Sequence, residues 1–107
     1  MSQYNKLVRD NIPEIIKRSG KEFSMLILSE EKYRIALNKK IDEELNEYYD
    51  AKDNKEAIEE LADILELIQV SAETLGFSLE QLEKIRKVKA EKNGSFKKRV
   101  FLIEIED

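Results

Sequence analysis

The sequence predicts a mainly α-helical protein of one domain, and three observations support this prediction. The chain has 107 residues, which suits a single domain over residues 1–107. Hydrophobic residues make up 41% of it and charged residues 39%, a balance typical of amphipathic helices around a modest core. Apolar side chains recur at helical spacing in two long segments with a short polar connection. We therefore expect an antiparallel helical bundle.

The first expected elements are a short N-terminal helix and a strand. The stretch Asp10-Asn11-Ile12-Pro13 is typical of a helix start because proline fits the first turn, and Gly20 lies just past the end of residues 14–19. The apolar run at residues 23–28 favours a strand, and the tail at residues 99–105 is also β-prone. We expect a small β pairing between these two segments.

Two long helices form the expected centre of the domain. Residues 30–51 carry apolar side chains at helical spacing, and Ser29 precedes them as an N-cap. Residues 55–75 are apolar on one face and partly on a second side, so we expect a partner subunit to cover the surplus and form a homodimer or homotetramer. The main stripe comprises Ile58, Leu61, Leu65, Ile68, Ala72 and Leu75. A third long helix, over residues 79 to about 92, begins at the capping box Ser78-x-x-Gln81 and ends at Gly94.

The composition excludes several kinds of chemistry and partner. The chain contains no cysteine and no histidine, which removes thiolate catalysis, imidazole acid–base catalysis and the usual zinc ligands. A formal net charge of −4 gives no cationic field for a nucleic acid polymer. The polar start at residues 1–6, and the lack of an apolar stretch of roughly 20 residues, predict a cytoplasmic protein with no membrane partner.

The candidate site residues are acidic side chains at helical spacing on the first two long helices: Glu43, Glu44, Glu47, Glu60 and Asp63. A separation of three residues places Glu44 beside Glu47, and Glu60 beside Asp63, on one helix surface. Glu44 also falls inside the apolar stripe of its helix. A carboxylate in that position is costly unless a cation, hydrogen bonds or a proton neutralises it.

The short connection around residues 52–54 predicts that both acidic pairs converge, because the helices must run antiparallel. Converging carboxylates repel one another, and a hard cation with oxygen ligands, Mg²⁺ or Mn²⁺, relieves the repulsion. One such acidic pair alone is usually a solvated helix face. The second pair and the position of Glu44 favour a metal site instead.

At these residues the sequence resembles the all-α nucleoside triphosphate pyrophosphohydrolases, the MazG-like superfamily, whose motif is EExxE, a short spacer and then ExxD. The opening residues 4–16 (YNKLVRDNIPEII) are similar to the start of its phosphoribosyl-ATP pyrophosphohydrolase-like branch. The resemblance implies that Glu44, Glu47, Glu60 and Asp63 bind Mg²⁺ and that Glu43 orients or deprotonates water. It also implies cleavage of a small-molecule nucleotide to a monophosphate and pyrophosphate, with a house-cleaning role as one option.

Binding of a triphosphate also needs cations and hydrogen-bond donors outside the acidic core. The substrate-binding candidates are Lys6, Arg9, Lys89, Lys92 and Asn93, of which Lys6 and Arg9 rank first. The related branch carries a basic residue, two glycines and phenylalanine near its carboxyl end, where this chain has Lys92-Asn93-Gly94-Ser95-Phe96. Serine in place of the second glycine weakens the prediction for a close backbone approach there.

Two alternatives to this hydrolase stay open. The first is a catalytically silent oligomerisation or regulatory module whose acidic residues are inherited from an enzyme. The second lies within the enzyme class and is hydrolysis of phosphoribosyl-ATP itself. Titration of Mg²⁺ against melting temperature distinguishes the silent module, because only a ligand that binds the native state raises its stability.

Overall fold

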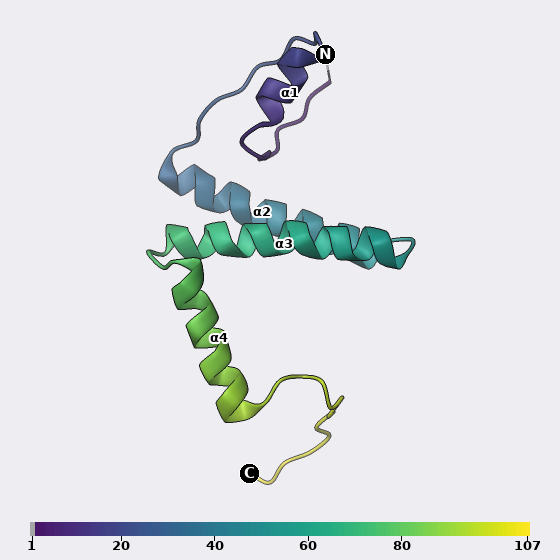
Figure 1. Ribbon diagram of the computed structural model, residues 1–107, viewed down its shortest axis with the longest axis vertical. Helices are drawn as coiled ribbons and strands as arrows, with labels where there is room; N and C mark the ends of the chain where they lie inside the picture. The colour runs from purple at the N-terminus through teal and green to yellow at the C-terminus, as the bar shows by residue number, and fades with distance from the viewer. Residues whose placement is uncertain (1) are drawn as a thin grey trace.

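The computed structural model describes residues 2–107, which form four helices (Figure 1). These are α1 (Ile12–Arg18), α2 (Glu30–Tyr49), α3 (Asn54–Thr74) and α4 (Leu79–Asn93). The described residues contain no strand. The mainly α-helical class is therefore confirmed, and the helix bounds lie within about two residues of those predicted from the sequence.

Helices α2 and α3 lie side by side and antiparallel, and they form the largest helix–helix contact of the chain (Figure 1). Side chains at the N-caps fix where each helix begins: the Ser29 hydroxyl accepts a hydrogen bond from the Lys32 amide at 3.3 Å, and an Asp53 carboxylate oxygen accepts one from the Glu56 amide at 2.8 Å. A short turn after α2 leaves no room for another arrangement. The end of α2 therefore lies beside the start of α3, as the sequence predicts.

The core is small and lies along the seam between α2 and α3. Its buried apolar side chains are Leu37 on α2 and Ile64 and Ala72 on α3. Glu44 is buried with them, at 6% exposure. Of the apolar side chains predicted on α3, Ile64 on the second side and Ala72 on the main stripe are buried in the single chain, whereas the rest of the main stripe is exposed.

The outer helices extend from the two sides of this pair. Helix α1 packs against no other helix, and α4 packs only against α3 (Figure 1). The start of α4 is fixed by the capping box predicted from the sequence, in which Ser78 and Gln81 each accept a hydrogen bond from the other's backbone amide. At its other end, Gly94 adopts a φ of +85°, which ends the helix and turns the tail away.

The expected β pairing of residues 23–28 with residues 99–105 is absent from the described chain, so that prediction is wrong for a single chain. Both segments lack regular secondary structure. The first lies on the α1 side of the α2–α3 pair and the second lies beyond α4 on the other side (Figure 1). Two strands must lie about 4.8 Å apart to pair, and the helix pair separates these two segments.

The chain has a much larger surface than a compact protein of its mass. Its accessible area is 10303 Å² at 12.6 kDa, whereas a compact monomer of that mass exposes about 6,200 Å². The radius of gyration is 18.3 Å, against about 13 Å for a compact chain of this length. The two areas differ by about 4,100 Å², and many large apolar side chains are exposed. Among the residues that the structure describes, no helix is both long and apolar enough to cross a membrane.

Candidate metal centre

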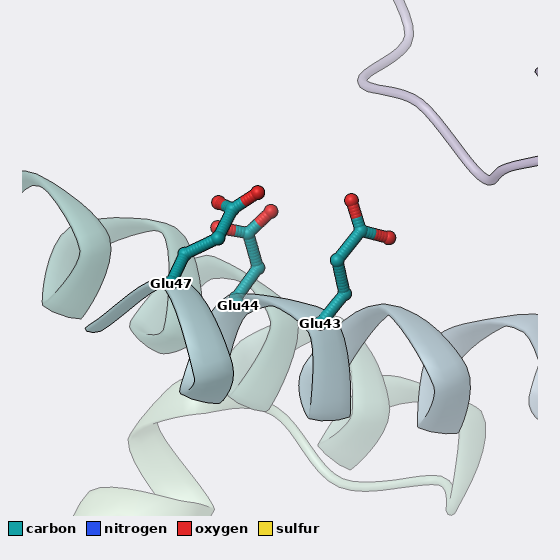
Figure 2. Close-up of side chains that lie close together, drawn as sticks. All are labelled: Glu43, Glu44 and Glu47. Atoms are coloured by element: carbon teal, nitrogen blue, oxygen red, sulfur yellow. The ribbon is translucent and has the colours of Figure 1, made fainter. Parts of the chain in front are cut away.

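The five acidic candidates come from two adjacent helices. Glu43, Glu44 and Glu47 project from the same side of α2, with the carboxylates of Glu44 and Glu47 next to each other (Figure 2). Glu60 and Asp63 lie one turn apart on α3. Because the helices are antiparallel, these positions on α3 lie opposite the acidic turn of α2.

The carboxylates form two groups that share Glu44. One group contains Glu43, Glu44 and Glu47, and the other contains Glu44, Glu60 and Asp63. Within each group, one oxygen from every residue lies within 4.8 Å of the others. The convergence expected from the sequence is therefore present in the structure, and Glu44 is the residue that both groups share.

Glu44 is the central residue of the cluster in electrostatic terms. Its Oε1 lies 3.5 Å from the Lys40 ammonium, but its Oε2 is buried and has no hydrogen-bond partner. The Oε2 of Glu60 is also buried without a partner. Burial raises the pKa of Glu44, and the nearby Glu60 carboxylate raises it further. Such oxygens need a proton or a cation, since an unpaired buried charge is costly.

The pKa values of the other two α2 carboxylates in the cluster, Glu43 and Glu47, shift in opposite directions. Partial loss of hydration raises the pKa of Glu47, and the neighbouring Glu44 carboxylate adds to the increase. Burial also acts to raise the pKa of Glu43, but the hydrogen bond from Lys6 and the positive charges of Lys40 and Lys6 outweigh it, so the net shift is downward. Glu43 therefore stays ionised more readily than its neighbours and can accept a hydrogen bond from water.

Two of the predicted phosphate ligands contact this cluster. The Lys6 ammonium lies 3.2 Å from Oε1 of Glu43, and the Arg9 guanidinium lies 2.6 Å from Oδ1 of Asp63. Both cations come from the irregular segment before α1, and both side chains remain about half exposed. Each has N–H groups that can bind phosphate oxygens as well as carboxylates.

Lys40 is a cation of the site that the sequence analysis missed. Its ammonium lies 3.4 Å from Oε1 of Glu43 and 3.5 Å from Oε1 of Glu44. The signal was present in the sequence, because a lysine three and four residues before two glutamates lies on the same helix face. Its side chain is only 21% exposed, so it is held more firmly than Lys6 or Arg9.

The carboxyl-terminal candidates are not brought to the cluster within one chain. Lys89, Lys92 and Asn93 lie in the last part of α4, which leaves the α2–α3 pair on the side away from α1 (Figure 1). All three are exposed. A role for them in substrate binding therefore stays a prediction that requires a site on another copy of the chain.

The residues present fit a hard divalent cation. Every candidate ligand is a carboxylate oxygen, which is the donor that Mg²⁺ and Mn²⁺ prefer, and the chain has no cysteine or histidine to compete as a ligand. The partnerless buried oxygens of Glu44 and Glu60 are free to coordinate. Glu47 is exposed, so the cluster is open to solvent and to a ligand on that side.

The site is a helical pair that brings carboxylates together around the buried Glu44, beside lysine and arginine, and it thus presents oxygen ligands and cationic donors side by side. The sequence profile of the family described as phosphoribosyl-ATP pyrophosphohydrolase matches residues 4–91, and the chain belongs to this family. The family is part of the MazG-like all-α superfamily, so the resemblance found in the sequence is confirmed. The family's description names a hydrolase that acts on phosphoric anhydrides, the enzyme class that the resemblance implies.

A curated relative gives a shorter match. An uncharacterized protein of Mycolicibacterium smegmatis is 43% identical to this chain over 54 residues, which are 50% of this chain and 55% of the relative. The chain thus spans about half the length of the curated relative that it matches. No solved structure matches the chain.

Proposed function

We propose that this protein is a Mg²⁺-dependent nucleoside triphosphate pyrophosphohydrolase that releases pyrophosphate and a nucleoside monophosphate. Glu44, Glu47, Glu60 and Asp63 would hold the ion, with Mn²⁺ as a substitute. The observation that carries the proposal is the buried Glu44 carboxylate, whose free oxygen lies in a cluster with acidic groups from the neighbouring helix. Bound Mg²⁺ would neutralise charge on the phosphates and lower the pKa of a bound water.

The chain's own residues then supply binding, orientation and proton transfer. Glu43, which is ionised, accepts a hydrogen bond from the attacking water and orients it or takes its proton. Lys6 and Arg9 exchange their carboxylate partners for phosphate oxygens and hold the triphosphate across the cluster. Lys40 stays beside Glu43 and Glu44 and limits the repulsion between them.

Release of pyrophosphate and phosphate from a panel of nucleoside triphosphates and diphosphates, with Mg²⁺ present, tests the proposal. Glu44→Gln and Asp63→Asn should each abolish pyrophosphate release. Asp42→Asn and Glu59→Gln are matched controls, because both residues are exposed acids next to the cluster but outside it. Full activity in both cluster variants would refute the assignment.

The family membership also supports a specific substrate. Phosphoribosyl-ATP is the compound that the family's description names, so it belongs in the substrate panel as the main competitor of ordinary and damaged nucleotides. The silent regulatory module is the remaining alternative. It predicts no rise in melting temperature with Mg²⁺ or Mn²⁺, whereas a metal that binds only the native cluster must raise it.

We also propose that the working protein is a homodimer or homotetramer. The excess surface of about 4,100 Å² is several times the roughly 800 Å² that each partner buries in a standard interface. Along α3 and at its C-cap the exposed apolar side chains are Ile58, Leu61, Leu65, Ile68 and Leu75. They recur at helical spacing and are exposed, so a second helical pair could cover them, as in a four-helix bundle.

A further inference from the structure

Two apolar segments of the chain are exposed and have no partner in the structure. One is residues 23–28, between α1 and α2, and the other is residues 100–105, in the tail after α4. The exposure of the apolar tail side chains ranges from 71% at Leu102 to 88% at Phe101, and Ile27 in the first segment is 85% exposed. Apolar surface of this density is typical of a contact surface.

The fold of one chain keeps these segments apart. Residues 23–28 lie on the α1 side of the α2–α3 pair, and α4 carries the tail to the opposite side (Figure 1). The tail leaves α4 at Gly94, and Arg99, just before the apolar segment, has a positive φ of 59°. The segments are of equal length and β-prone, yet each is left with unpaired backbone amides and carbonyls.

We propose that the two segments pair between copies: residues 100–105 of one chain form an antiparallel β-ribbon with residues 23–28 of a second copy. We call this pairing the exchanged ribbon. In a two-fold dimer it forms twice, because the second chain returns its own tail to the first chain. Each exposed segment therefore pairs with a segment of another copy of the same protein.

The charges that flank the segments select the antiparallel direction. Lys97 and Lys98 precede the tail segment, and Glu30 and Glu31 follow residues 23–28. Antiparallel pairing places these opposite charges side by side. With Phe23 opposite Ile105 it also places Asp107 opposite Lys21, so that three opposite-charge pairs outweigh the one like-charge pair, Glu22 with Glu106. Parallel pairing would instead bring the acidic end of the tail, residues 104–107, beside Glu30 and Glu31, where like charges repel.

The apolar pattern selects the register. When Phe23 lies opposite Ile105, Met25 lies opposite Ile103, and the alternation of side chains gives the ribbon one wholly apolar face. That face comprises Phe23, Met25, Ile27, Phe101, Ile103 and Ile105. A slip of one residue would move Glu104 onto the same face, so the register is specified by burial.

Disulfide trapping tests the exchanged ribbon, and the chain suits it because it has no cysteine of its own. Met25→Cys and Ile103→Cys are introduced into separate chains that differ in size by a tag, and the two chains are co-expressed and oxidised. We expect a disulfide between the two different chains, because directly opposite residues on neighbouring strands are close enough to be linked. The matched control replaces Met25→Cys by Ser24→Cys, which lies on the other face and should link at least tenfold more slowly.

A chain that carries both Met25→Cys and Ile103→Cys separates exchange from pairing within one chain. The exchanged ribbon predicts covalent dimers in denaturing gels. A disulfide within the monomer, or linkage no faster than in the control with Ser24→Cys, overturns the proposal.

Hydrogen exchange gives a test without cysteines. The amides of residues 23–28 should be protected in the intact protein and should lose that protection when only the tail is changed, by Phe101→Asp. Unchanged protection of residues 23–28 in this variant would contradict the ribbon. The pairing requires neither metal nor nucleotide, so its failure would leave the proposed hydrolase intact, and inactive carboxylate variants would leave the ribbon intact.

Discussion

The Arg9 guanidinium lies 2.6 Å from Oδ1 of Asp63, although the two residues are 54 positions apart in the chain. Together with the pair between Lys6 and Glu43, this contact ties the irregular N-terminal segment to the α2–α3 pair. The side chain of Arg9 is 60% exposed and that of Asp63 is 39% exposed, so the ion pair is weak and exchangeable. Arg9 thus neutralises the carboxylate that we propose as a metal ligand, and it is free to move to a phosphate when the ligand arrives.

Replacement of Arg9 by glutamine should therefore strengthen the binding of Mg²⁺ and weaken the binding of the nucleotide. Without the competing guanidinium, the cluster should bind Mg²⁺ alone roughly two- to fivefold more tightly, which is the range of an exposed ion pair. The KM for the nucleotide should rise about tenfold or more, because a charge-assisted hydrogen bond to phosphate is lost. Calorimetric titration with Mg²⁺ and steady-state kinetics measure the two effects.

The control for Arg9→Gln is Arg18→Gln. Arg18 is also an exposed arginine near the amino terminus, but its ion pair is with Glu14 within α1 and not with the cluster. This variant should leave both constants unchanged. Equal effects of the two variants would show that net charge alone, rather than the contact with Asp63, explains the result.

The Glu44→Gln variant should lose its response to Mg²⁺ and its activity without losing stability. The amide has a similar volume and no charge, so the metal-free variant should unfold at the same temperature as the parent protein or a few degrees higher. The rise in melting temperature with Mg²⁺ should disappear, and pyrophosphate release should fall at least about 100-fold. Differential scanning calorimetry with and without Mg²⁺ measures the first two effects. A variant that melts far below the parent protein without metal would contradict the view of Glu44 as an unsatisfied charge.

The raised pKa values of Glu44 and Glu47 predict how metal binding depends on pH. Both carboxylates must lose their protons to coordinate, so Mg²⁺ affinity should increase as the pH rises above the ordinary glutamate pKa of 4.5. Proton release on binding appears as a different apparent heat in buffers of different ionisation enthalpy. Affinity that is independent of pH in this window would show that the two groups are not ligands.

In the metal-free protein, the raised pKa of Glu44 makes its contribution to stability decrease as the pH rises, whereas the Mg²⁺ affinity increases. Its pKa in the folded state lies above the ordinary value of 4.5, so its contribution to stability is fully present below pH 4.5 and is lost as the pH rises through the folded pKa. Glu44→Gln removes this titration. The difference in melting temperature, parent minus variant, should therefore decrease as the pH increases from 4.5, and a difference that increases would contradict the assigned sign.

The parts of the fold that were predicted correctly depend on local chemistry. Ser29, Asp53 and the Ser78–Gln81 capping box specify where α2, α3 and α4 begin, because each satisfies backbone amides within its own first turn. The burial of Glu44 was also predictable, since its angular position follows from the helical repeat alone. These features require no knowledge of distant contacts.

The parts that were missed depend on distant contacts. Helix α3 has apolar side chains on two sides, and the sequence alone does not show that Ile64 faces α2 while Leu61 and Leu65 face outward. The ion pair of Arg9 with Asp63 joins an irregular segment to a helix, and no periodic pattern encodes it. The β propensity of residues 23–28 and 99–105 was recognised, but propensity does not specify whether the partner lies in the same chain.

The outward face of α3 gives the last prediction, which concerns assembly. Leu65 is 59% exposed in the single chain, whereas burial against a second copy would remove it from water. Leu65→Glu should place a charge in that interface and lower the particle mass in sedimentation equilibrium toward that of one chain, 12.6 kDa. Lys39→Glu, at an exposed position on α2, changes the net charge by more and should leave the mass unchanged. If both variants keep the mass of the parent protein, the outward face of α3 is not the helical interface, and the excess surface must be covered elsewhere.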